Sequence, residues 1–158
     1  MFYFLVVAPS DVLAAKHVLE FPYTRSVGPV IGRFLAGLRE GRILGVRAPD
    51  GTVVVPPLEY DPHTGQATGD FVQVGTAGVV TTWTWVSEPL PKHPLTRPFA
   101  WALIRLEGAD TAMLHAVDAG GDTERMSTGM RVRIRWADKR VGHIRDIECF
   151  EPADGDLP

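Results

Sequence analysis

The sequence contains a single cysteine, Cys149. One cysteine cannot form a disulfide bond within the chain, and it cannot supply a cysteine-only metal site. A chain without disulfide bonds is typical of a reducing compartment, so we expect a cytoplasmic protein. Cys149 lies near Ile147 and Phe150 in a segment of strand-like composition. That setting favours a buried, unreactive thiol over a nucleophile.

The sequence also has no apolar run long enough to cross a membrane. Its most apolar stretch, MFYFLVVAP at the N-terminus, is too short to span a bilayer. It lacks the positive charges that begin a signal peptide. We interpret it as an extended segment that covers an apolar surface, on this chain or on a partner, and we predict no membrane association.

A basic excess is absent as well, since 16 Lys and Arg face 19 Asp and Glu and the net charge is −3. This balance makes a nucleic-acid-binding protein unlikely. One predicted strand nevertheless places Arg131, Arg133 and Arg135 on one face. They form either a solvated face or an electrostatic patch for phosphate groups or for an acidic partner. Trp83 and Trp85 also share a face, which suits a core, an interface or base stacking.

No catalytic motif is present: the chain has no GxSxG, no P-loop, no GxGxxG after a strand and no HExxH. The five histidines are scattered along the sequence. For His115, in a predicted strand, we expect an ordinary hydrogen-bond partner. We therefore predict no catalytic residue in this chain. A stand-alone hydrolase or thioesterase remains as an alternative that substrate turnover by the isolated chain would reveal.

Two helices are predicted near the N-terminus. Ser10 can cap a short helix from Asp11 to Glu20. A stronger helical pattern runs over residues 26–39, with Pro29 near its start and Gly41 after its end. An apolar stripe follows this second helix: Val27, Val30, Ile31, Phe34, Leu35 and Leu38. The stripe either docks on a partner or covers the hairpin or one end of this chain's own barrel.

The rest of the chain is predicted to be β. Two short strands flank the turn Ala48–Gly51, which has hairpin chemistry. A turn-rich loop at residues 59–70 follows, and then short strands separated by Gly and Pro indicate a small barrel. The predicted strands cover residues 42–46, 52–55, 71–74, 78–86, 99–106, 111–116, 130–136 and 144–150. The fold class is thus mostly β with N-terminal helices.

The order of these elements resembles a known family. The segments that carry the resemblance are FLAGLREGRILG, DGTVVVPP, AGVVTTWTWV, RPFAWALIRLEGADTAMLHAV, GMRVRIRW and DIECFEP, within residues 23–152. The family comprises acyl-CoA-associated OB-fold proteins with an N-terminal zinc ribbon. Its members are partners of thiolase-like proteins, including aldolases that cleave steroid-CoA side chains. The resemblance implies a helical docking segment at 1–41, a ribbon-like hairpin and loop at 42–70, an OB-fold barrel at 71–152 and a tail at 153–158.

The zinc ribbon of the family is degenerate in this sequence. The resemblance places Arg47, Asp50, Asp61 and Thr64 where family members carry two cysteine pairs. Structural zinc prefers thiolate or imidazole ligands, and an arginine cannot serve as one. We therefore expect no zinc and no other cofactor, and we expect Asp50 and Asp61 to stabilise turns.

The resemblance further implies a non-catalytic accessory subunit of a thiolase-like lyase or acyltransferase, in a heterotetramer or a larger hetero-oligomer. An acyl-CoA ester is then the substrate of the complex. A single-stranded nucleic-acid-binding OB module is the alternative. The residues that we expect to dock on the partner are Tyr23, Arg25, Ile31, Phe34, Leu35 and Leu38. Those that we expect near the acyl-CoA are Trp83, Trp85, His93, Arg97, Arg131 and Arg133.

Overall fold

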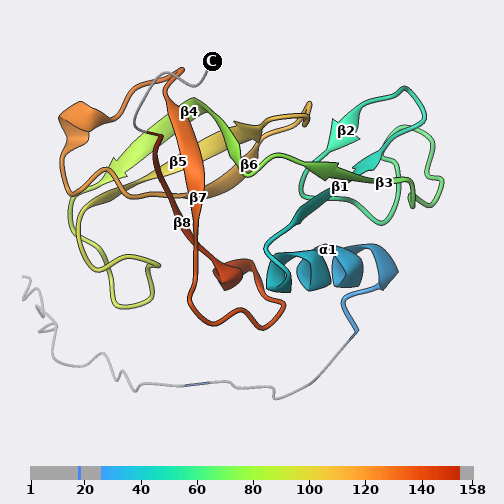
Figure 1. The fold of residues 1–158 in the computed structure, drawn as a ribbon, viewed down its shortest axis with the longest axis horizontal. Coiled ribbons are helices and arrows are strands. Elements are labelled where there is room, and N and C mark those ends of the chain that lie inside the picture. The colour runs from blue at the N-terminus through green and yellow to red at the C-terminus, as the bar shows by residue number, and fades with distance from the viewer. Residues whose placement is uncertain (1–17, 19–25, 154–158) are drawn as a thin grey trace, which may run out of the picture.

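A computed structural model describes residue 18 and residues 26–153 of the chain. These residues form one α-helix, a small three-stranded sheet and a closed five-stranded barrel (Figure 1). The predicted helix from Asp11 to Glu20 and the docking candidates Tyr23 and Arg25 lie outside the described residues, apart from position 18. The prediction of a mostly β fold with an OB-type barrel is confirmed.

The helix α1 spans Pro29–Arg39, within the range that the apolar pattern predicts. Its N-cap is Gly28, whose φ of 87° suits glycine. No described helix is both long and apolar enough to cross a bilayer.

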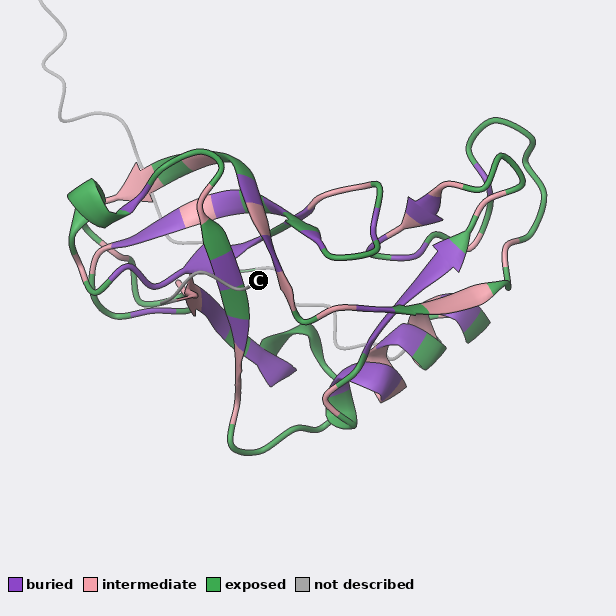
Figure 2. Cartoon of the chain, turned by 45° about the horizontal axis from the view of Figure 1, so that its top comes forward, coloured by how far each residue is buried: buried purple, intermediate pink, exposed green. Residues whose placement is uncertain are grey.

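The apolar stripe of α1 is buried within this chain. Phe34 and Leu38 are only 3% and 0% exposed, and they belong to the main hydrophobic core (Figure 2). The helix packs against β1, Ile43–Arg47, and against the 3-10 helix η3, Ile144–Asp146. The structure therefore corrects the assignment of Phe34 and Leu38 to partner docking, because burial in the chain's own core leaves no surface to offer. Ile31 and Leu35 are half-buried.

The small sheet contains β1, β2 (Val53–Val54) and β3 (Phe71–Val74) in the order β2-β1-β3. Both pairings are antiparallel. Residues 71–74 were predicted to begin the barrel, but β3 pairs with β1 instead, with Phe71 opposite Val46. The closed barrel thus begins at Ala77. At Gly45 a Cβ would lie 2.8 Å from the Val54 carbonyl oxygen, so the sheet requires glycine there.

The barrel is built from five strands in the order β4-β5-β6-β8-β7. Their bounds are β4 Ala77–Val86, β5 Phe99–Leu106, β6 Met113–Val117, β7 Arg131–Trp136 and β8 Ile147–Pro152. A short 3-10 helix, η2, covers Thr123–Arg125 between β6 and β7. Inward side chains of the strands fill the barrel, as the alternating burial of β7 illustrates.

The last predicted strand, residues 144–150, is split in two. Ile144–Asp146 form η3, and β8 begins only at Ile147. Asp146 is buried, and its carboxylate accepts hydrogen bonds from the backbone amides of Val141 (3.0 Å), Gly142 (2.7 Å) and His143 (3.2 Å). These bonds hold a turn where a strand was expected. The strand β8 pairs with β6 only where Phe150 lies opposite Val117.

Candidate functional site

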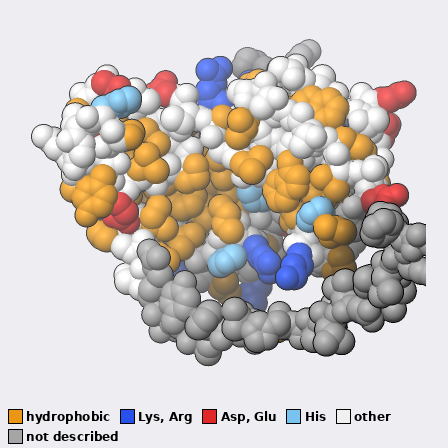
Figure 3. All heavy atoms as spheres, turned by 180° about the vertical axis from the view of Figure 1, so that it is seen from behind, with side chains coloured by type: hydrophobic (Ala, Val, Ile, Leu, Met, Phe, Trp, Pro, Cys, Tyr) orange, Lys and Arg blue, Asp and Glu red, His pale blue; other side chains and the backbone are white. Residues whose placement is uncertain are grey.

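A groove of about 810 Å³ opens on the barrel between β6, the loop that joins β4 to β5, and the segment from η3 into β8. Figure 3 shows this face, where hydrophobic side chains gather around histidine and basic side chains. The groove is lined by Pro91, Lys92, His93, Pro94, Trp101, Leu114, His115, Ile144, Arg145, Ile147 and Glu148. A concave, largely apolar surface with a few polar groups is the usual form of a binding site.

One wall of the groove is the proline-rich loop before β5, and it is braced internally. The His93 amide donates to the Leu90 carbonyl at 2.9 Å, while the Leu90 amide donates to Nδ1 of His93 at 3.1 Å. The His93 ring meets Phe99 and Trp101 edge-on, at centroid distances of 5.6 and 6.4 Å. The wall therefore has one well-defined shape, which lowers the entropy lost when something binds to it.

His115 lines the groove from β6 and is only 7% exposed. Its ring meets Phe150 edge-on at 5.6 Å. Among the described residues, its Nδ1 has no hydrogen-bond partner, although backbone groups of Ala116 and Ile144 lie near enough to the ring to oppose part of the pKa shift, and the expectation of an ordinary partner stays a prediction. Burial lowers the pKa of His115, so the imidazole is neutral near physiological pH. The groove thus has a neutral polar ring at its base.

The charges around the groove are mostly positive. Lys92 and Arg145 are exposed, and the described ion pairs include neither of them. Glu148 is the acidic residue of the lining, and its Oε2 lies 3.1 Å from Nε of Arg135. Since Arg135 already balances this carboxylate, the rim has a local positive excess on a chain of net charge −3.

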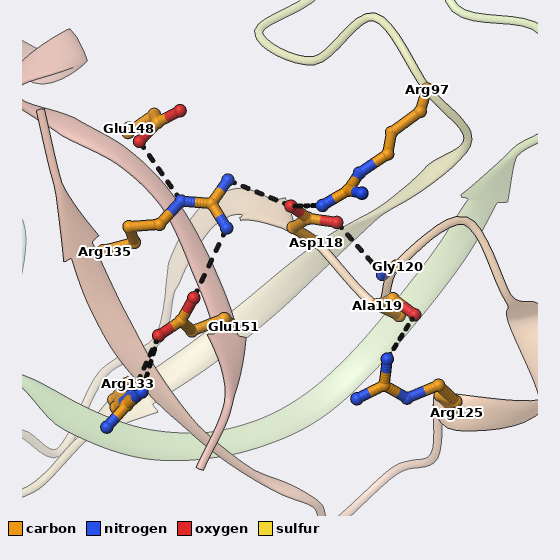
Figure 4. A network of polar contacts seen from close by, with 9 residues as sticks. All are labelled: Arg97, Asp118, Ala119, Gly120, Arg125, Arg133, Arg135, Glu148 and Glu151. Carbon is orange, nitrogen blue, oxygen red and sulfur yellow. Dashed lines mark hydrogen bonds and ion pairs between the residues drawn. The ribbon is translucent and has the colours of Figure 1, made fainter. Parts of the chain in front are cut away.

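A second polar cluster lies around Asp118, directly after β6 (Figure 4). Its nearly buried carboxylate accepts from the guanidinium of Arg97, from Nη2 of Arg135 at 2.9 Å and from the Gly120 amide at 3.0 Å. Burial by itself would raise the pKa of Asp118, but these hydrogen bonds hold it below its usual value. Burial also opposes the charge of Arg135, yet the hydrogen bond to Asp118 raises the pKa of that guanidinium.

The arginines of β7 are all paired with acids. Arg131 pairs with Glu107, and Nη2 of Arg133 lies 2.9 Å from Oε1 of Glu151. The positive charge of this arginine face is therefore largely neutralised, which is unfavourable for binding the phosphates of a nucleic acid. Trp83 and Trp85 are half-buried and pack against the core. Neither arrangement favours the nucleic-acid alternative.

The predicted acyl-CoA-proximal residues do not come together in one place. His93 lines the groove, and Arg97 belongs to the Asp118 cluster. Trp83, Trp85 and Arg131 belong to neither, and Arg133 is connected to the Asp118 cluster only through Glu151, which also pairs with Arg135 (Figure 4). The role of these residues toward acyl-CoA stays a prediction.

The degenerate ribbon is held by hydrogen bonds instead of ligands. Oδ1 of Asp61 accepts from the His63 amide (3.0 Å), the Thr64 amide (2.7 Å) and the Thr64 hydroxyl (2.9 Å). The hydrogen bonds from Thr64 are the main reason why the pKa of Asp61 is lowered. Oδ1 of Asp50 accepts from the Thr52 amide at 2.9 Å, and Arg47 donates to the Gly51 carbonyl at 3.0 Å.

Turn stabilisation by Asp50 and Asp61 is therefore confirmed. A guanidinium at one ligand position, and carboxylates engaged by turn amides at two others, do not fit a zinc ion. Within the described residues, no group of three or more His, Cys, Asp or Glu side chains is placed to hold a metal ion.

Several groove residues were not identified from the sequence. Trp101, Leu114 and Ile144 line the groove, although nothing in their local patterns distinguishes them from ordinary strand residues. Leu114 is 61% exposed in the middle of β6. An exposed leucine between two buried neighbours could indicate a binding surface, but this pattern is recognisable only once the bounds of the strand are known.

Cys149 matches its prediction, because it is buried and burial raises the pKa of its thiol to about 12.

Comparisons with known proteins agree with this architecture. Residues 71–137 match the family model described as the ChsH2 C-terminal OB-fold domain. A chain from the structure of the Ltp2-ChsH2(DUF35) aldolase is similar in fold, with a TM-score of 0.60 and 21% identity over 82% of this chain and 99% of that one. A protein of unknown function from the DUF35 family of Sulfolobus solfataricus aligns with a TM-score of 0.54 and 23% identity over 68% of this chain and 77% of that one. No curated protein matches the sequence. Residues 71–137 of the chain therefore match the OB-fold domain of the ChsH2 type.

Proposed function

We propose that this chain is a non-catalytic accessory subunit that binds a thiolase-like acyl-CoA enzyme in a hetero-oligomer. The observation that carries the proposal is the match of residues 71–137 to the ChsH2 C-terminal OB-fold domain. The fold-level similarity to a chain of the Ltp2-ChsH2(DUF35) aldolase supports it, since that chain is covered almost completely. The family resemblance implies that the partner is thiolase-like.

The described residues also support a non-catalytic role. The only thiol is buried and has a pKa raised to about 12, so little thiolate forms near neutral pH. Among the described residues, His115 has no hydrogen-bond partner at Nδ1 and no carboxylate bound to it, so it lacks the carboxylate that orients the base of many catalytic pairs. A rigid barrel without a reactive cluster is suited to offering surfaces to another protein.

In this role the partner supplies the nucleophile and the acid–base groups for an acyl-CoA substrate with a bulky acyl group, such as a steroid side chain. This chain supplies a docking surface and walls for the acyl-CoA site. Ile31 and Leu35 remain docking candidates on α1, because their side chains are only half-buried. We expect the complex in the cytoplasm, without zinc or another cofactor in this subunit.

The test is co-expression of the chain with a thiolase-like protein from the same genome, followed by size-exclusion chromatography with light scattering. We expect co-elution at the mass of a heterotetramer or a larger assembly, and faster acyl-CoA turnover by the complex than by the partner alone. The isolated chain should show no acyl-CoA turnover. Separate elution of the two proteins, or turnover by the isolated chain, would refute the proposal.

A further inference from the structure

The groove-facing edge of β6 is unpaired over most of its length. One edge of β6 pairs with β5 from Met113 to Val117. On the other edge, β8 reaches β6 only at Val117, opposite Phe150. Ile147 and Cys149 of β8 pair with β7 but not with β6. An unpaired strand edge presents backbone N–H and C=O groups that can pair with another extended chain.

The outer edge of β2 in the small sheet, by contrast, is closed by Asp110 and Thr111. The Val53 amide donates to Oδ2 of Asp110 at 2.7 Å, and the Val53 carbonyl accepts from the Asp110 amide at 2.9 Å. The Thr111 hydroxyl accepts from the Val55 amide at 2.8 Å and donates to the Val55 carbonyl at 3.0 Å. Within the described residues, the groove-facing edge of β6 has no comparable protection from side chains.

Apolar side chains lie along this open edge. Leu114 is largely exposed, Ile144 is exposed on the opposite side of the groove, and Trp101 lies on the neighbouring strand. The neutral His115 adds no charge to the base of the groove. Exposed apolar groups beside unpaired backbone are the two features that strand addition uses, since the backbone gives affinity and the side-chain pockets give selectivity.

The charge of the rim restricts the occupant. Lys92 and Arg145 would attract acidic residues at the ends of a bound segment. A symmetric contact between two copies of this groove would bring the same cations together, which is unfavourable. A different protein that presents acidic groups beside an apolar stretch fits the surface better.

We propose that the groove between β6 and the η3–β8 segment docks an extended, apolar segment of the partner protein, flanked by acidic residues, which adds to β6 as a strand. This inference rests on the proposed function, because it names the surface through which that partner binds. The braced wall at His93 and Trp101 keeps the groove shaped before binding, so little ordering is lost there.

The experiment uses hydrogen exchange and mutagenesis on the reconstituted complex with the thiolase-like partner. Amides on the groove-facing edge of residues 114–116 should exchange readily in the free chain and should be protected in the complex. Leu114→Asp should weaken partner binding by about tenfold or more, because it places a charge against an apolar segment. Arg145→Glu should weaken it in a salt-dependent manner. The matched control is Tyr60→Asp, at a residue 65% exposed in the loop between β2 and β3, which should leave binding unchanged.

The outcomes separate this inference from the proposed function. A complex that forms without new protection on β6, and that tolerates both Leu114→Asp and Arg145→Glu, overturns the docking surface and leaves the accessory role standing. Absence of any complex overturns both. If the β6 amides are already protected from hydrogen exchange in dilute free chain, a segment of the chain itself occupies the groove. If protection of these amides rises with the concentration of the chain alone, a second copy of the chain occupies the groove. Either result overturns the inference.

Discussion

Replacing Asp118 by Asn tests whether the Arg97–Asp118–Arg135 cluster stabilises the barrel. The substitution keeps the size of the side chain and removes the buried negative charge that two guanidinium groups share. Breaking a buried pair in this way typically costs about 3–5 kcal/mol. Arg135 would keep Glu148 and Glu151, and the half-exposed Arg97 can turn to water. We therefore expect a loss of about 2–3 kcal/mol in the free energy of unfolding, below that typical range.

The measurement is urea-induced unfolding followed by tryptophan fluorescence, with the denaturant slope held common to all variants. The matched control is Glu148→Gln, which removes a more exposed partner of Arg135 and should cost no more than about 1 kcal/mol. A loss for Asp118→Asn that is no larger than the loss for the control would refute the idea that burial makes this carboxylate important.

The pH dependence provides a second check on the same residue. Because the pKa of folded Asp118 lies below its unfolded value, the carboxylate stabilises the folded state above the ordinary aspartate pKa of about 3.9. This stabilisation decreases as the pH falls below that value and through the folded pKa. The difference in stability between wild type and Asp118→Asn should therefore shrink in acid. A difference that stays constant from neutral to strongly acidic pH would contradict the electrostatic explanation.

Three further predictions follow from the described contacts. The Cys149 thiol should react with a disulfide reagent only after denaturation, because burial raises its pKa to about 12; rapid reaction of the native protein would contradict this. Glu59→Ala should lower the free energy of unfolding by about 0.5–2 kcal/mol, since Oε1 of Glu59 accepts from two amides in the first turn of α1 at 3.0 and 3.1 Å. The control, Glu40→Ala, removes an exposed carboxylate at the other end of the helix and should have little effect. Asp61→Ala should lower the melting temperature, because it removes the hydrogen bonds that hold the turn. Added zinc or a chelator should not change the melting temperature of the wild type. An increase on addition of zinc would show that the ribbon-like hairpin and loop still bind metal.

Local patterns were sufficient for the individual elements of the fold. Enrichment in β-branched and aromatic residues between glycine and proline breakers predicted strands 71–74 and 99–106 with the bounds that the structure has. The helical stripe predicted α1 to within a few residues. These features depend on neighbours in sequence, so periodicity contains the necessary information.

Features that depend on distant residues were not accessible from the sequence. The pairing of β3 with β1 and the destination of Phe34 and Leu38 follow from how whole elements pack. The cap of α1 comes from Glu59, which is 28 and 29 residues away from the amides that it accepts from, so no local capping rule could find it. The turn at Asp146 replaced part of a strand because its carboxylate satisfies three nearby amides, and composition alone does not reveal that choice.

The same limit applies to the groove. Its position depends on β8 beginning at Ile147 and on how far β8 then lies from β6, so Leu114 and Ile144 face each other only in three dimensions. His93 was singled out from its loop, yet for proximity to acyl-CoA rather than as part of a braced wall. The sequence could thus predict an accessory role through resemblance, but it could not locate the surface.

The contacts of Asp110 and Thr111 with Val53 and Val55 have a consequence for how the chain folds. β2 has only two paired residues on β1, and its other edge depends on groups 56 and 57 residues further along the chain, in the turn between β5 and β6. Closing so long a loop is entropically costly until the barrel strands have met. The small sheet should therefore become complete late, after the β5–β6 hairpin. A nascent chain that ends before that hairpin would lack the partners that hold β2 in place.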